Sequence, residues 1–239
     1  MKEDNLLRVL IEAGVGSRRK LAAAIMKGRV TLNGSVVSDL RYPVDISKDA
    51  ITLDDEAIGM AKKELVYLMI NKPAGVLSTV RDERGRKTVA DLIPEKYRHL
   101  RLYPAGRLDK DTTGLILLTN DGALTNRITH PRYGSEKEYF IQIDGLLKED
   151  DINRLEQGIE IEGNKTSLAK VKKLDNTPPY NYSITIHEGR KRQVRRMFLA
   201  LGYRTLALKR VRTGNLTLGN LKEGEVKELN NREVKLLSD

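Results

Sequence analysis

Two segments of this 239-residue chain hold the residues whose types and spacing could do chemistry. The first, residues 103–114, combines Gly, Arg, Asp and Thr and leads into an apolar run, so a rigid strand would present its side chains. Asp109 is the acid of interest, because a carboxylate placed in this way can act as a base or a nucleophile. Lys110 and Asp111 follow it directly, so the spacing alone is equally typical of an ordinary solvated turn.

The second segment, residues 188–198, predicts a helix that carries several arginines. Its apolar positions repeat at helical spacing and define one inward face: Val194, Met197, Phe198 and Leu201. Arg192 and Arg196 project away from that face, toward solvent or phosphate. Arg195 lies at its border, from where it could reach inward and pair with a partly buried carboxylate. Alternatively, its aliphatic stem covers the edge of the core.

The elements that must position these segments are predicted from residue 65 onward, where strands alternate with short helices. The apolar runs at 65–70 and 114–119 indicate buried strands. Further strands are expected near 138–143, 183–187 and 205–211, and helices near 123–129, 149–157 and 192–201. The mix predicts an α+β domain over residues 65–239, with a central mixed, largely antiparallel β-sheet flanked by short helices.

A small helix-rich module is predicted for residues 1–60. Ser17 is a good N-cap for its second helix, and Asn33-Gly34 between two β-favouring runs is a strong hairpin signal. The expected elements are helices over 6–13 and 18–27, strands over 30–32, 35–37 and 50–53, and a linker over 56–64.

The charge of the chain favours a polyanionic partner. The formal net charge is +10 and the pI is about 9.6, while 32% of the residues are charged with both signs present. In the small module no acid lies between residues 13 and 38, and a basic face could contact phosphates. An ordinary solvated helix face is the alternative. The residues of this face are Arg18, Arg19, Lys20, Lys27 and Arg29.

The composition also argues against several classes of site. The chain has no cysteine, and its three histidines lie far apart, so we expect no thiolate site, no metal and no cofactor. There is no signal-peptide pattern and no apolar run near the roughly 20 residues that span a bilayer. We therefore expect a cytoplasmic monomer that does not enter a membrane.

The motifs of this sequence resemble those of two known families, one for each predicted domain. Residues 16–20 and 28–34 resemble the S4-like RNA-binding domain, which covers about the first 60 residues and implies docking on structured RNA. The rest of the chain resembles the RsuA/RluB-type ribosomal pseudouridine synthases, through five motifs in the same order. These are Ile70-Asn71-Lys72-Pro73-Ala74-Gly75-Val76, Gly106-Arg107-Leu108-Asp109, residues 114–122, Lys137-Glu138-Tyr139 and residues 187–197.

The second resemblance implies a role for each matching residue. Asp109 matches the catalytic aspartate, and Tyr139 matches a tyrosine that stacks on the target base and can accept a proton. Arg195 matches the basic residue paired with that aspartate, which keeps the carboxylate ionised and oriented. The residues expected to contact substrate or RNA are Lys72, Arg107, Arg190, Arg192, Val194 and Arg196, together with Arg18, Arg19, Lys20 and Arg29.

The implied reaction is the isomerisation of a uridine to pseudouridine in ribosomal RNA, which involves neither redox change nor net hydrolysis. The base must leave the RNA stack, and an aromatic ring offsets part of that cost. The large-subunit RNA is the favoured target and the small-subunit RNA stays open. Two rivals remain: a non-catalytic RNA-binding or ribosome-assembly protein, and a nuclease or glycosidase using Asp109 with Asp111. The second is disfavoured, because side chains two residues apart on an extended loop point apart.

Overall fold

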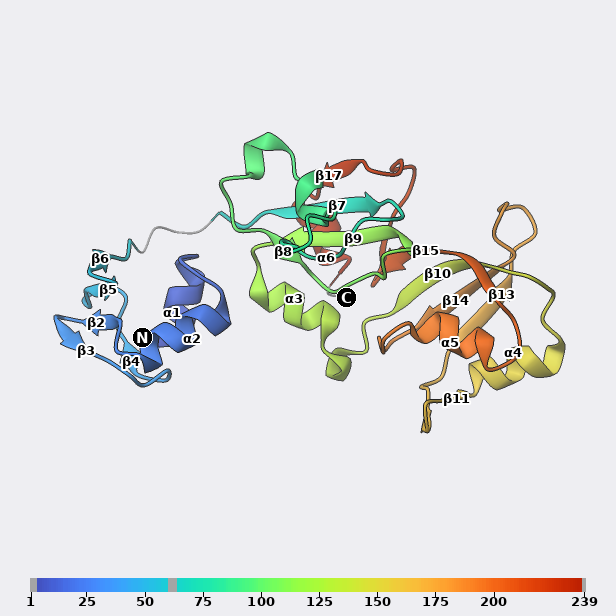
Figure 1. Cartoon of the computed structure of the whole chain (residues 1–239), viewed down its shortest axis with the longest axis horizontal. Helices are drawn as coiled ribbons and strands as arrows, with labels where there is room; N and C mark the ends of the chain where they lie inside the picture. Colours follow the sequence, from blue (N-terminus) through green and yellow to red (C-terminus); the bar gives the residue numbers. More distant parts are fainter. Residues whose placement is uncertain (1–3, 60–63, 238–239) are drawn as a thin grey trace. The chain divides into compact units, whose positions relative to one another are not determined.

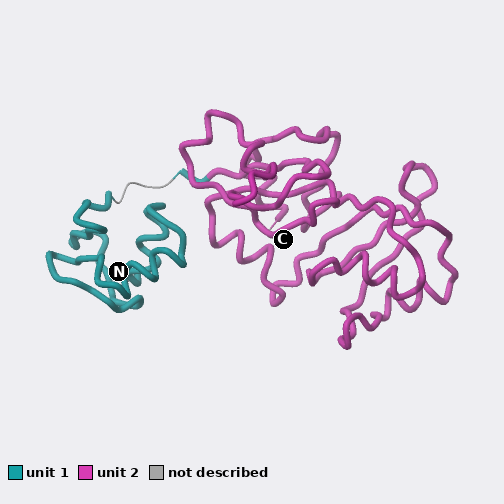
Figure 2. The backbone as a smooth tube through the Cα atoms, in the orientation of Figure 1, with its two compact units in different colours: residues 1–65 teal, residues 66–239 magenta. Residues whose placement is uncertain are grey.

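The computed structural model describes residues 4–59 and 64–237 and divides the chain into two compact units, residues 1–65 and 66–239 (Figure 2). Of the expected linker over 56–64, residues 60–63 lie outside the described residues. The linker prediction was wrong at its start, because Glu56–Ala57 form strand β6, which pairs with β5. In the described ranges, no helix is both long enough and apolar enough to cross a membrane.

The first unit packs two helices beside a small antiparallel sheet, as the sequence predicted. Ser17 caps the second helix by accepting a hydrogen bond from the Lys20 backbone N at 3.2 Å. Asn33 and Gly34 both have positive φ, 51° and 82°, which is the backbone of a tight hairpin turn. The elements are β1 (Asp4–Asn5), α1 (Leu6–Glu12), α2 (Arg18–Met26), β2 (Val30–Leu32), β3 (Ser35–Val36), β4 (Pro43–Val44), β5 (Ile51–Leu53) and β6; the sheet order is β3-β2-β5-β6, and β1 pairs with β4.

The second unit is built on a nine-stranded sheet of order β13-β14-β10-β15-β9-β7-β17, with β16 on β15 and β8 on β9 (Figure 1). All neighbours run antiparallel except β9 and β15, so the predicted mixed, largely antiparallel sheet is confirmed. Its strands are β7 (Tyr67–Lys72), β8 (Tyr103–Pro104), β9 (Thr113–Thr119), β10 (Lys137–Ile143), β13 (Lys170–Lys173), β14 (Tyr182–Ile186), β15 (Thr205–Thr213), β16 (Leu216–Thr217) and β17 (Val226–Glu228).

The strands β7 and β9 are buried on both faces, which explains their continuous apolar sequences. Leu68 and Ile70 belong to one hydrophobic cluster, while Met69 between them belongs to another on the opposite face. Such strands hold their position firmly, and the loop that precedes β9 contains Asp109.

Gly114 allows the one parallel contact of the sheet. Its φ is +103°, and a Cβ there would lie 2.2 Å from the backbone O of Arg210 on β15. Only a residue without a side chain permits β9 and β15 to approach so closely at the end of the Asp109 loop.

Short helices complete the unit. Three were predicted and are confirmed, namely α3 (Gly122–Thr129), α4 (Glu149–Glu156) and α5 (Gln193–Leu199). The sequence did not indicate β13, β17, the small hairpin of β11 (Glu160–Ile161) and β12 (Asn164–Lys165), or α6 (Asn231–Lys235). The remaining elements are the 3-10 turns η1 (Val89–Leu92), η2 (Glu95–Tyr97) and η3 (Pro131–Tyr133).

Candidate active site

A cavity of about 580 Å³ in the second unit lies between the Asp109 loop, β10, the end of β14 and the start of α5. It brings together Asp109, Tyr139 and Val194, which come from three separate segments of the sequence. Its size falls in the range of small-molecule sites. The other lining residues are Arg107, Leu108, Thr112, Ile186, Gly189, Arg190, Lys191, Arg192, Gln193 and Leu208.

Asp109 contributes an accessible, unpaired carboxylate. The side chain is partly buried, and in the part of the chain that the structure describes its carboxylate forms neither a hydrogen bond nor an ion pair. Its backbone is fixed, because its carbonyl accepts a hydrogen bond from the Thr112 N at 3.1 Å. A carboxylate without a protein partner is free to act on a molecule in the cavity.

Tyr139 presents its ring to the same cavity from β10. The residue is only 8% exposed, and its register partners are Ile184 on β14 and Arg210 on β15. A ring fixed between two strands is a rigid surface against which a planar base can stack at little entropic cost. Val194, Ile186 and Leu208 supply further apolar surface around it.

Arg195 was expected to pair with Asp109. The ion pair that the structure shows for Arg195 is with Asp111, while Asp109 acts on its guanidinium electrostatically and opposes the lowering of its pKa. The Arg195 Nη2 lies 3.7 Å from the Oδ2 of Asp111 and donates to the Asp111 carbonyl at 3.2 Å, while Nη1 donates to the carbonyl of Thr205 at 3.4 Å. Arg192 pairs with the same carboxylate at 3.5 Å.

Electrostatics keep the Asp111 carboxylate ionised. Burial acts to raise the pKa of Asp111, but its own backbone N–H, Arg195 and Arg192 outweigh burial, and the pKa lies below its usual value. Burial lowers the pKa of Arg195, and Asp111 opposes that change. Arg192 holds its place from a left-handed conformation, φ 53°, that is strained for a residue with a side chain.

Lys72 was expected to contact RNA, and the structure contradicts this. The residue is 0% exposed, and its ammonium donates to three carbonyls: Pro73 and Val76 at 2.8 Å and Lys110 at 3.2 Å. Burial lowers its pKa to about 8, although nearby carboxylates, Asp111 first among them, oppose the change. Lys72 therefore has no surface for phosphate and instead ties β7 to the Asp109 loop.

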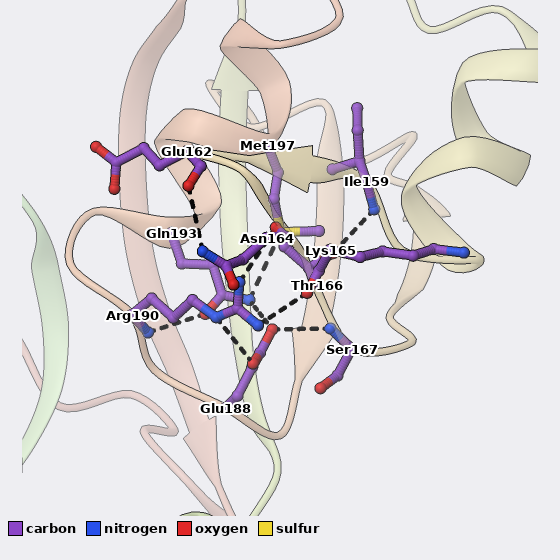
Figure 3. Close-up of polar contacts among 10 residues, drawn as sticks. All are labelled: Ile159, Glu162, Asn164, Lys165, Thr166, Ser167, Glu188, Arg190, Gln193 and Met197. Carbon is purple, nitrogen blue, oxygen red and sulfur yellow. Dashed lines mark hydrogen bonds and ion pairs between the residues drawn. The ribbon is translucent and has the colours of Figure 1, made fainter.

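Arg190 lines the cavity, but its guanidinium is held by the β11–β12 hairpin (Figure 3). It donates to the carbonyls of Asn164 at 3.3 Å and Lys165 at 2.8 Å, and pairs with Glu188 at 3.3 Å. Gln193 links the same group, donating to Glu188 and accepting from the Arg190 N. These contacts fix the loop that forms one wall of the cavity.

Two other predicted arginines are also paired within the protein. Arg196 pairs with Glu162 near the same hairpin and is absent from the cavity lining. In the first unit Arg29 forms a bidentate pair with Asp54, Nε to Oδ1 at 2.6 Å, so its charge is offset. Arg18, Arg19 and Lys20 are exposed on α2, and their contact with RNA stays a prediction.

Sequence reasoning missed several members of the site. Thr112, Ile186, Lys191, Gln193 and Leu208 line the cavity without having been singled out. The signal for Ile186 and Leu208 was present, since alternating strand positions next to the Tyr139 strand must face the same side. Among the described residues, no group of three or more His, Asp or Glu side chains could hold a metal ion.

Comparison with known proteins supports the two resemblances that the sequence motifs indicated. Residues 66–200 match the model of the RNA pseudouridylate synthase family, and residues 5–51 match the S4 domain. A Bacillus subtilis protein named ribosomal large subunit pseudouridine synthase B is 42% identical, over 98% of this chain and 95% of that protein. A Pseudomonas aeruginosa protein of the same name is 39% identical, over 99% of this chain and 62% of that protein.

A solved structure agrees with these relatives. It is titled as the crystal structure of pseudouridylate synthase and superposes with a TM-score of 0.70 at 34% identity, over 98% of this chain and 99% of that one. The expected fold and family are therefore confirmed. The chain belongs to the RNA pseudouridylate synthase family.

Proposed function

We propose that this enzyme isomerises a specific uridine of large-subunit ribosomal RNA and that Asp109 is its catalytic carboxylate. The observation that carries the proposal is the cavity, which holds the unpaired carboxylate of Asp109 and the ring of Tyr139 together. The choice of the large subunit rests on the names of the Bacillus subtilis and Pseudomonas aeruginosa relatives.

The target base must enter the cavity outside the RNA stack. Unstacking costs a few kcal/mol, which stacking on the Tyr139 ring and apolar contact with Val194 offset. Among the described residues the Tyr139 hydroxyl forms no hydrogen bond, so it can interact with the base or accept a proton. Arg107 and Arg192, at the cavity, supply positive charge for the flanking phosphates.

The chemistry exchanges one bond to the sugar for another. The bond from C1′ to N1 breaks, the uracil turns, and C5 bonds to C1′. The proton on C5 is then lost, and N1 gains one. Asp109 provides the negative charge beside the sugar that this exchange needs, either as a nucleophile or as a base. The ion pairs of Arg192 and Arg195 are with Asp111, so in the described part of the chain the Asp109 carboxylate is not held in an ion pair.

The first unit contributes affinity in this proposal. Arg18, Arg19 and Lys20 are exposed on one helix and can neutralise phosphates without reading sequence. We expect the protein to work in the cytoplasm as a monomer, with neither metal nor cofactor. Isomerisation should therefore continue at an unchanged rate in excess EDTA.

The test of Asp109 is an Asp109→Asn variant, assayed on an unmodified large-subunit RNA transcript that carries tritium at C5 of uridine. Wild-type enzyme should release the tritium, and the same reaction on unlabelled RNA should leave the mass of the RNA unchanged. The variant should lose at least about 10⁴-fold in rate, while RNA binding and stability remain. Tritium release by Asp109→Asn at near wild-type rate would contradict the assignment.

The target is tested separately by mapping pseudouridines in ribosomal RNA from a strain that lacks the gene. Carbodiimide-dependent stops of reverse transcription should disappear at one position of the large-subunit RNA. A stop lost from the small-subunit RNA would move the target and leave the role of Asp109 in place. No lost stop in either RNA would refute the ribosomal target.

A further inference from the structure

The Ser78 hydroxyl holds the backbone of the residue that precedes Asp109. Its Oγ donates to the Leu108 carbonyl at 2.8 Å and accepts from the Leu108 N at 3.0 Å. A serine hydroxyl can donate and accept at the same time, so this one side chain satisfies both backbone groups of Leu108.

The residue after Asp109 is held from the same segment of the chain. The Lys110 carbonyl accepts from the Gly75 N at 2.8 Å and from the Lys72 ammonium at 3.2 Å. Asp109 therefore lies between two residues whose backbones are bonded to residues 72–78. In the described part of the chain its carboxylate forms no hydrogen bond and no ion pair, so the backbone anchors are the contacts that hold its position.

We propose that Ser78 is a positioning residue for Asp109, a role that rests on the proposed function of Asp109 itself. Leu108 is only 6% exposed, and among the described residues its N–H and C=O have no partner other than Ser78. Removal of the hydroxyl leaves both groups buried and unpaired. The loop then shifts to satisfy them, and the Asp109 carboxylate moves with it.

The expected effect falls on the chemical step and not on RNA binding. Ser78 is not among the residues that line the cavity, so it does not touch the base. A displacement of about 1 Å at a reacting group lowers a rate by roughly 100-fold. Partial relaxation of the loop would give less, so we expect a decrease of about 10- to 100-fold.

The chain offers a matched control in the next residue. The Thr79 hydroxyl also donates to a backbone carbonyl, that of Arg81, at 3.0 Å. That contact stays within its own loop and does not reach residues 108–110. Thr79→Ala removes a hydroxyl from the same segment and leaves the anchors of Asp109 intact.

The experiment compares wild-type, Ser78→Ala, Ser78→Thr and Thr79→Ala enzymes on the tritiated large-subunit RNA transcript. Single-turnover rate constants, the Kd for RNA and the melting temperature are measured for each. Ser78→Ala should lose 10- to 100-fold in rate constant with a Kd within about twofold of wild type. Ser78→Thr keeps the hydroxyl and should recover most of the rate, and Thr79→Ala should resemble wild type.

Three results would overturn the proposal. They are a Ser78→Ala rate within twofold of wild type, an equal loss in Thr79→Ala, and a loss that disappears at a lower temperature where the variant is fully folded. If Ser78→Ala does not fold, the proposal is decided by the rate constant of Ser78→Thr at the lower temperature. Because this variant keeps the hydroxyl, a rate constant tenfold below that of wild type would contradict the proposed role. Failure of the wild-type enzyme on this RNA would instead count against the proposed function.

Discussion

Because the ammonium of Lys72 is buried, the free energy of unfolding of the second unit should change with pH in the alkaline range. Lys72 is 0% exposed and protonated at neutral pH, with a pKa lowered by burial to about 8 from the ordinary 10.5. Between these two values the unfolded chain binds more protons at this position than the folded one. Unfolding therefore becomes less favourable as pH rises through this window.

The size of the effect follows from the two pKa values. Between pH 7 and pH 9.5, linkage gives an increase of up to about 2 kcal/mol in the free energy of unfolding from this group. Lys72→Met removes the titration. At pH 7 the variant loses bonds to three carbonyls but also relieves the burial of a charge. Because these effects oppose each other, the change with pH is the informative quantity.

Urea unfolding followed by circular dichroism, at pH 7 and pH 9.5, measures this change. Relative to Lys72→Met, the wild-type protein should gain up to about 2 kcal/mol on going to the higher pH. Lys172→Met is the control, because Lys172 is exposed on β13 and its removal should leave the difference from wild type unchanged. A wild-type advantage over Lys72→Met that stays constant within about 0.5 kcal/mol would refute the reasoning.

Two further predictions concern the sheet and the RNA-binding face. Gly114→Ala should prevent stable folding of the second unit, since its Cβ would lie 2.2 Å from the Arg210 carbonyl; a near wild-type melting temperature would contradict the close β9–β15 contact. Arg18→Ala should weaken RNA binding and reduce the salt slope by about one, whereas Arg29→Ala should do less, because Asp54 already pairs with Arg29. Filter binding across a salt series tests this order, and equal losses would contradict it.

Local sequence was enough to predict the elements that carry strong periodicity or turn chemistry. The Asn33-Gly34 hairpin, the cap at Ser17 and the doubly buried strands β7 and β9 all follow from short-range rules. Strand β17 was missed because it is three residues long and mostly polar, and only its pairing with β7 makes it a strand. Non-local pairing of this kind leaves little trace in the sequence.

The residues of the site also fall into those that the sequence identified and those that only the fold reveals. The ordered motifs identified Asp109, Tyr139 and Val194, and the structure places them at one cavity. Lys72 was misread because a lysine in a turn is usually exposed, and only the fold shows that three carbonyls surround its ammonium. Ser78 carried no signal, since its partner is thirty residues away.

The contrast between Asp109 and Asp111 shows what the fold adds to the motif. Two acids two residues apart look equivalent in sequence, and both lie near the same arginines. Asp111 pairs with Arg192 at 3.5 Å and with Arg195 at 3.7 Å, whereas Asp109 lines the cavity and forms no ion pair in the described part of the chain. A carboxylate bound in two ion pairs is a poor nucleophile or base, because reaction would have to break those pairs. Arg195 therefore forms an ion pair with one acid and acts on the other through space, so that in the described part of the chain the acid outside an ion pair is the one beside Tyr139.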